Sequence, residues 1–116
     1  MQNDGLLPFI NQIEILKSEG NYQAAKSIVD SLLVKHTDDY RLYEELCDIY
    51  LFMGDHPRAS EAISVARSLN PESATGMYLL GYLSITHGNF ALGIELLERA
   101  NELFPNNPEI LRNLGW

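Results

Sequence analysis

The same punctuation recurs every 34 residues along the chain. Three glycines, Gly20, Gly54 and Gly88, fall in register, and each is followed by Asn or Asp and then by a residue with a ring. A small residue and then an aliphatic residue follow each ring at constant spacing. A repeat of this length indicates stacked helical hairpins, because each unit buries its apolar face only against its neighbours. The period therefore predicts an all-α chain.

Two helices are expected in each unit, one before the glycine and one after it, because apolar residues recur there at helical spacing. Glycine suits the left-handed residue just beyond a helix end, and Asn21 and Asp55 can cap the helices that follow. The predicted units cover residues 6–39, 40–73 and 74–107, and residues 108–116 predict a further helical stub. Helix breaks are expected near Gly20, His36, Gly54, Asn70, Gly88 and Pro105.

Small residues inside the predicted helices, among them Ala59, Gly81 and Gly93, point to close contacts between backbones. A glycine in the middle of a helix costs about 1 kcal/mol relative to alanine. A chain that accepts this cost once per hairpin is expected to bring the two helices of the hairpin unusually close together.

The pattern resembles that of tetratricopeptide repeat proteins. It is carried in the second and third units by Tyr43, Leu46, Cys47, Tyr50, Gly54, His56, Ala59, Ile63, Ala66, Pro71, Met77, Leu80, Gly81, Gly88, Phe90, Gly93, Leu97, Ala100 and Pro105. The first unit departs from it, with Gln12 in place of leucine and Thr37 in place of proline. The resemblance implies a single domain: a right-handed α-solenoid of three helix-turn-helix units plus the start of a fourth helix pair.

The resemblance further implies that the first helix of each unit lines a concave groove that holds an extended or helical segment of a partner protein. The residues expected to face this groove are Ile10, Glu14, Arg41, Glu44, Asp48, Thr75, Tyr78, Tyr82 and Ile85. Tyr78 and Tyr82 lie beside a cluster of carboxylates, Glu14, Glu44, Glu45 and Asp48, so the groove is predicted to be acidic. Such a groove suits a segment that carries Lys or Arg next to apolar anchors. The alternative is that the tyrosines pack against neighbouring helices and the acids only face water.

The best-known groove of this family clamps a C-terminal carboxylate with lysine, asparagine and arginine. The matching positions here are Ile10, Glu14, Glu45, Thr75 and Leu79, and none of them carries a matching donor. An acidic groove would also repel a carboxylate. Ligands of the clamp type are therefore not expected.

Charge and hydropathy exclude several classes of partner. Sixteen acidic residues against eight basic ones give a net charge of -8, which repels nucleic acids and anionic lipid surfaces. No run of 18 apolar residues occurs, and the first residues lack the basic flank of a signal peptide, so the cytoplasm is the expected location. The only cysteine, Cys47, is expected in the core.

Enzymatic, metal and cofactor sites are not expected. Each of the three histidines has a simpler explanation, since His36 and His87 lie near predicted helix ends and His56 takes the place of a ring in the repeat. No two histidines have the i, i+4 spacing of a helical zinc site, and no glycine-rich phosphate loop is present.

The second functional hypothesis is a self-associating scaffold. In it, Leu111, Leu114 and Trp116 at the end of the solenoid mediate a weak homodimer, or the chain is a fragment of a longer array of repeats.

Overall fold

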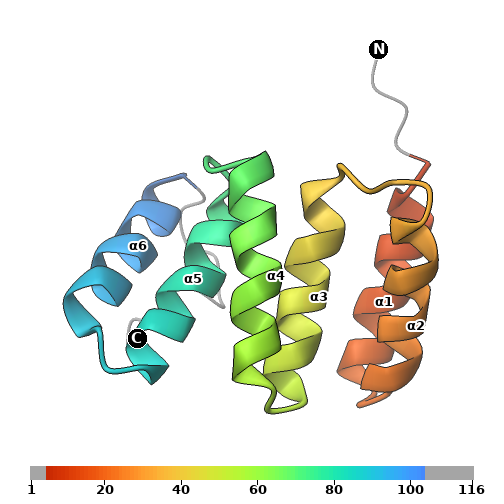
Figure 1. Ribbon diagram of the computed structural model, residues 1–116, viewed down its shortest axis with the longest axis horizontal. Helices are drawn as coiled ribbons and strands as arrows, with labels where there is room; N and C mark the ends of the chain where they lie inside the picture. The colour runs from red at the N-terminus through yellow and green to blue at the C-terminus, as the bar shows by residue number, and fades with distance from the viewer. Residues whose placement is uncertain (1–4, 104–116) are drawn as a thin grey trace.

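The structure, a computed structural model, describes residues 5–103, which form six helices and no strand. The helices are α1 (Leu7–Ser18), α2 (Tyr22–Leu33), α3 (Tyr40–Phe52), α4 (His56–Leu69), α5 (Ala74–Thr86) and α6 (Phe90–Leu103). They form three helical hairpins that stand side by side in a row, with α1 and α2 at one end and α6 at the other (Figure 1). The all-α repeat prediction is confirmed. The predicted break at Pro105, the stub 108–116 and the self-association residues Leu111, Leu114 and Trp116 lie outside the described residues.

The turn inside each hairpin has the same geometry. Gly20, Gly54 and Gly88 have φ angles of 82°, 78° and 87°, in the left-handed region where glycine is favoured. The amide after each glycine donates to a carbonyl five residues earlier, as Asp55 N does to Tyr50 O at 2.8 Å. These contacts use carbonyls that the helix end leaves unpaired. The 34-residue spacing of the glycines therefore reflects one turn built three times.

The sequence predicts that the side chains of Asn21 and Asp55 cap α2 and α4, and only Asp55 does so. The side chain of Asp55 accepts a hydrogen bond from the amide of Arg58 at 3.2 Å, as expected. Asn21 is the N-cap of α2, but its side chain makes no capping bond and instead contacts Glu19 at 3.4 Å. Asn21 thus occupies the predicted N-cap position, but the predicted side-chain cap is not formed.

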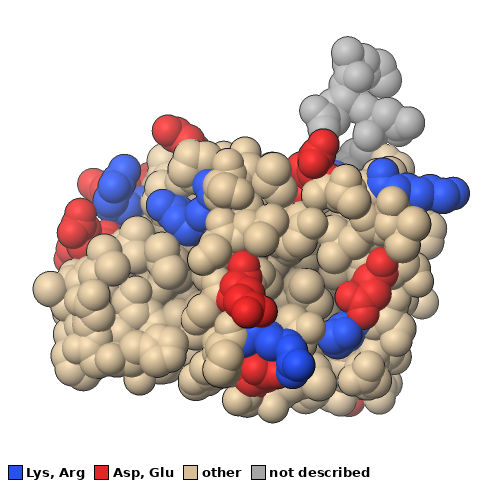
Figure 2. All heavy atoms as spheres, in the orientation of Figure 1, with Lys and Arg blue, Asp and Glu red and all other residues tan. Residues whose placement is uncertain are grey.

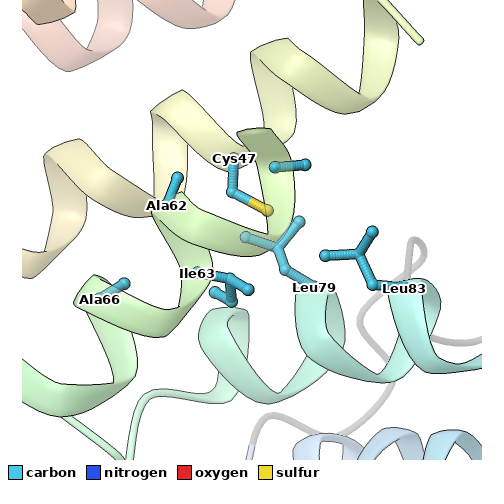
Figure 3. Packing of buried hydrophobic residues seen from close by; sticks show 7 residues of the cluster. Cys47, Ala62, Ile63, Ala66, Leu79 and Leu83 are labelled. Atoms are coloured by element: carbon cyan, nitrogen blue, oxygen red, sulfur yellow. The ribbon is translucent and has the colours of Figure 1, made fainter. Parts of the chain in front are cut away.

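The core runs between the hairpins as well as inside them. One cluster joins the second and third hairpins and contains Cys47, Ala59, Ala62, Ile63, Ala66, Leu79 and Leu83 (Figure 3). A second joins the first and second hairpins through Leu6, Ile13, Ala25, Val29, Leu42 and Ile49. Burying a large aliphatic side chain contributes on the order of 1.5 to 3 kcal/mol, so stacking stabilises every hairpin. None of the described helices is long and apolar enough to cross a membrane.

The third hairpin contains the close helix contact that the sequence predicts. A Cβ atom added at Gly81 would lie 3.0 Å from the carbonyl oxygen of Gly93. A Cβ atom added at Gly93 would lie 2.5 Å from Cγ1 of Ile85 and 2.9 Å from the carbonyl oxygen of Gly81. The prediction that small residues let α5 and α6 approach closely is thus confirmed for this pair.

We expect Gly93→Ala to destabilise the protein, although alanine is the better helix former. The added methyl group meets a backbone oxygen that cannot move without separating α5 from α6, and overpacking of this kind costs about 1 to 3 kcal/mol. Chemical denaturation followed by circular dichroism measures the change. The control is Ser64→Ala, at an exposed position of α4, which should change stability by less than about 0.5 kcal/mol. A Gly93→Ala protein as stable as the wild type would show that the contact is not tight.

Candidate functional site

A pocket of about 250 Å³ opens between the first helices of all three hairpins. Its walls come only from α1, α3 and α5: Ile10, Glu14, Lys17, Arg41, Glu44, Glu45, Asp48, Thr75, Tyr78 and Leu79. Most of the residues predicted to face the groove are among them, namely Ile10, Glu14, Arg41, Glu44, Asp48, Thr75 and Tyr78. Tyr82 and Ile85, farther along α5, are not part of this lining, and Ile85 packs against Gly93 of α6.

The five positions that match the carboxylate clamp of the family, Ile10, Glu14, Glu45, Thr75 and Leu79, all line this pocket. They come from three helices, so the register that the repeat assigns to them corresponds to a real juxtaposition in space. Their side chains offer two apolar groups, one hydroxyl and two carboxyl groups.

Lys17 lies in the middle of the acidic side of the pocket, and the sequence analysis missed this role. Its ammonium nitrogen is 3.0 Å from Glu14, 2.7 Å from Glu45 and 2.7 Å from Asp48, and its side chain is only 7% exposed. Glu14 is on the same helix, whereas Glu45 and Asp48 are on α3. Lys17 therefore ties the first hairpin to the second through buried ionic contacts.

One ammonium group cannot balance three carboxylates, and this imbalance affects the protonation of Glu45. Burial raises the pKa of Glu45 well above its usual range, an effect strengthened by the hydrogen bond to Glu14 and opposed by Lys17. The pKa of Lys17 is also raised, because the attraction of Asp48 and Glu45 exceeds the effect of its burial. Glu45 thus tends to keep a proton that it shares with Glu14, whose own pKa is lowered by Glu45 and Lys17 against the opposing effect of burial.

Glu45 and Lys17 are in close contact at the acidic side of the pocket. Oε1 of Glu45 is buried and has no hydrogen-bond partner among the described residues, although it lies 2.7 Å from the ammonium nitrogen. The same ammonium donates hydrogen bonds to Glu14 and to Asp48. Lys17 therefore donates hydrogen bonds to two of the three carboxyl groups and contacts the third at ion-pair distance.

Glu44 has a structural contact in addition to its place in the lining. Its side chain is 7% exposed and accepts a hydrogen bond from the hydroxyl of Ser73, at the start of α5. The hydroxyl of Ser73 in turn accepts from the amide of Gly76, at 3.2 Å. Burial raises the pKa of Glu44 in spite of these contacts. Glu44 therefore joins the second and third hairpins, as Lys17 joins the first and second.

The predicted carboxyl groups line the pocket, and two cations, Lys17 and Arg41, lie among them. Lys17 occupies the middle of one cluster, and Arg41 lines the pocket while its guanidinium donates to both oxygens of Asp39. The hydrogen bonds from Arg41 lower the pKa of Asp39. The exposed acidic surface of the pocket is then mainly Glu14, at 54% exposure, and Asp48, at 24%.

A signal for Lys17 was present in the sequence. Lys17 stands in the register of Leu51 and Ile85, so it is a charged residue at a position that is aliphatic in the other two units. A charge at a position that should be partly buried needs a partner, and Glu14 lies three residues earlier on the same helix face. The acids of α3 could be recognised as further partners only once the stacking was known.

The other titratable groups considered in the sequence analysis are accounted for in different ways. The rings of His56 and His87 meet edge to face, with centroids 6.1 Å apart, at the junction of the second and third hairpins. Cys47 is a buried free thiol whose pKa is raised by burial. Within residues 5–103, no group of three or more His, Cys, Asp or Glu side chains is arranged to hold a metal ion.

Replacing Lys17 with methionine should destabilise the protein strongly. The substitution keeps much of the apolar stem but leaves the buried carboxyl groups without their cation, and breaking such a contact costs about 3 kcal/mol. Thermal unfolding at neutral pH measures the loss. The matched control is Arg58→Met, which removes an exposed i, i+3 pair with Asp55 and should change the melting temperature little. Equal effects of the two changes would contradict a structural role for the Lys17 cluster.

Stability should fall as pH rises from about 5 to about 8, and Glu45 should be the main cause. A carboxyl group with a raised pKa binds more protons in the folded than in the unfolded state, so folding is favoured at the acidic end of this range. Glu44 has the same sign, whereas the shifts of Glu14 and Lys17 act outside this range. The slope should be at most about 1.4 kcal/mol per pH unit for one group.

The test is urea unfolding across this pH range for Glu45→Gln, whose amide can donate to Glu14 as a protonated carboxyl group does. This variant should flatten the pH dependence and should be more stable than the wild type at pH 8. Glu95→Gln, at an exposed position of α6, is the control and should leave the slope unchanged. If the unfolding free energy of Glu45→Gln depends on pH as steeply as that of the wild type, another group must cause the pH dependence.

Comparison with known proteins identifies the architecture. No family model matches the chain. One curated relative is the BBSome complex member BBS4 of Mus musculus, which is 25% identical over 96 residues; the match covers 83% of this chain and 18% of BBS4. This chain therefore spans about a fifth of the length of that relative.

Solved structures match over nearly the whole chain. The first TPR of Spaghetti (RPAP3), bound to an HSP90 peptide, has a TM-score of 0.77 at 18% identity, with 98% of this chain and 90% of that chain covered. The type III secretion chaperone SycD of Yersinia enterocolitica, in complex with a peptide of the translocator YopD, has a TM-score of 0.72 at 21% identity, with 96% and 85% covered. Together with the three identical glycine turns, these matches show that the chain has the fold of tetratricopeptide repeat proteins.

Proposed function

We propose that this chain is a protein-interaction module that binds a segment of a partner protein in the groove formed by α1, α3 and α5. The observation that carries the proposal is the pocket of about 250 Å³ whose lining comes from all three first helices and from no second helix. A segment lying there would contact every hairpin at once. No catalytic role is proposed for these residues.

Two of the similar structures support this use of the fold. One contains an HSP90 peptide and the other a peptide of YopD. Both share less than a quarter of their sequence with this chain, so they do not indicate which segment it binds. That choice depends on the side chains that line the pocket here.

The lining favours a segment that combines an apolar anchor with a basic residue. Ile10 and Tyr78 offer apolar and aromatic surface, and Glu14 and Asp48 offer carboxylate oxygens that remain partly exposed although they contact Lys17. A lysine or arginine of the ligand could approach these oxygens from the open side. It would offset the negative charge that Lys17 leaves uncompensated in the cluster of three carboxyl groups. Tyr82 stays in the proposed groove only as an extension beyond the pocket, and Ile85, which packs against α6, is not part of it.

We propose the cytoplasm as the location, since a single buried thiol requires no oxidising compartment.

The test compares two fluorescein-labelled peptides, one alternating leucine with lysine and the other leucine with glutamate, by fluorescence anisotropy. The lysine peptide should bind in a saturable manner and the glutamate peptide should bind at least about tenfold more weakly, since like charges oppose each other across the groove. Preference for the glutamate peptide would contradict the proposed ligand chemistry. Equal binding of both would indicate apolar contact alone.

The variant that locates the site is Thr75→Arg, at an exposed position in the lining of the pocket. It adds bulk and positive charge next to Arg41 and should weaken the lysine peptide about tenfold or more. Ser64→Arg is the matched control, because it adds the same side chain to an exposed position of α4, outside the pocket lining. Equal effects of the two variants would place binding outside the groove. Asp48 is unsuitable as a probe because its hydrogen bond from Lys17 makes it structural.

A further inference from the structure

Three carboxyl groups meet one ammonium group on the side of the pocket that α1 and α3 form. The contacts of Lys17 with Glu14, Glu45 and Asp48 are all 3.0 Å or shorter. On the face of the molecule that Figure 2 shows, by contrast, acidic and basic side chains lie near one another on a mostly uncharged surface. The pocket therefore contains more carboxyl groups than its ammonium group can balance.

The three carboxyl groups differ in how far they are removed from water. The side chain of Glu14 is 54% exposed and that of Asp48 is 24% exposed, whereas that of Glu45 is 13% exposed. When carboxyl groups share a site, a proton is held best by the group that water solvates least. Burial raises the pKa of Glu45 to about 8, and the hydrogen bond to Glu14 adds to this effect. Glu45 is therefore the group that carries the proton at neutral pH.

The other charged or titratable side chains around Glu45 in the pocket come from all three first helices. They are Glu14 and Lys17 of α1, Arg41, Glu44 and Asp48 of α3, and Tyr78 of α5. Arg41 donates to both oxygens of Asp39, whereas Lys17 contacts Glu45 directly. Burial also raises the pKa of Glu44, which accepts a hydrogen bond from Ser73. A test of Glu45 must therefore separate its proton from that of Glu44.

A cation of the ligand acts on this proton through Glu14 and Asp48. Both carboxyl groups are partly open to solvent, and both contact the ammonium group that also contacts Glu45. Because Glu14 is hydrogen-bonded to Glu45, a positive charge placed on Glu14 lies one carboxyl group away from the proton. Nearby positive charge favours the ionised form of a carboxyl group. By linkage, a cation that promotes ionisation of Glu45 binds more tightly when Glu45 is ionised.

We propose that the groove exchanges a proton for the cation of its ligand: when a lysine or arginine of the partner segment binds at Glu14 and Asp48, Glu45 releases its proton to the solvent. This inference rests on the proposed function of the groove. One positive charge enters the cluster and one leaves it, so its net charge stays the same. At low pH the ligand must displace the proton, whereas at high pH the proton is already gone. Affinity for a basic segment therefore rises with pH and levels off once Glu45 is ionised in the free protein.

The experiment is isothermal titration calorimetry with the unlabelled peptide of alternating leucine and lysine, blocked at both ends so that its termini do not titrate. Its lysines stay charged throughout, since their pKa is about 10. Loss of about one unit of pKa on binding changes affinity by at most about tenfold. The peptide should bind about threefold to tenfold more tightly at about pH 8 than at about pH 6.

Protons are counted in the wild type by repeating the titration near pH 7.5 in buffers with different heats of ionisation. Binding should release about half a proton or more. The comparison peptide has the same sequence with every lysine acetylated, which removes the charge and keeps the apolar stem. It should release no proton, and its affinity should not change with pH.

Glu45→Gln assigns the proton, because glutamine resembles the protonated carboxyl group and cannot ionise. This variant should bind the lysine peptide as the wild type does at about pH 6 and should lack the gain at about pH 8. Glu95→Gln, at an exposed position of α6, is the matched control and should keep the full pH dependence. Circular dichroism at both pH values checks that each protein is folded.

The possible results separate this inference from the proposed function. If the lysine peptide binds equally well at both pH values and releases no proton, the exchange is wrong and the groove remains a binding site. If the pH dependence persists in Glu45→Gln or appears with the acetylated peptide, the proton does not come from this exchange. If the lysine peptide fails to bind at either pH, the proposed function and the exchange are both wrong.

Discussion

The left-handed glycine turn is the constraint on which the rest of the structure depends. It ends each first helix and returns the chain as an antiparallel second helix, and it does so with the same φ angle and the same pair of backbone hydrogen bonds three times. Because all three hairpins leave the turn in the same direction, equivalent positions of the first helices come to lie next to each other. The pocket, the core clusters between hairpins and the contact between the His56 and His87 rings all follow from that alignment. A residue with a β-carbon at these turns would be strained, which is why the glycines keep a strict period.

Stacking of the hairpins is stabilised by two kinds of interaction with different consequences. Contacts within the apolar clusters have no preferred direction and tolerate substitutions that conserve volume. The polar contacts of Lys17 with α3 and of Glu44 with Ser73 are specific, because a buried charged or polar group is costly unless its partner is in place. Lys17, Glu44, Glu45 and Asp48 also line the pocket, so the walls of the proposed binding groove hold the hairpins in register. A ligand that draws on Glu14 or Asp48 therefore acts on the contact between the first two hairpins as well.

The sequence by itself determined the fold, the position of every described helix and the close approach of α5 and α6. These features are local or periodic: glycine at a helix end, apolar residues at helical spacing and small residues at a contact can all be recognised along the chain. It also identified most of the pocket lining, because register alone places Ile10, Glu14, Asp48, Thr75 and Tyr78 on the first helices at equivalent heights. Only the tertiary structure decided the charge of the groove. Lys17 contacts residues 28 and 31 positions away, Glu44 accepts a hydrogen bond from Ser73, and Ile85 packs against Gly93 of α6. Ion pairs depend on which side chains other helices bring within about 3 Å, and the periodicity of a single helix carries no information about that.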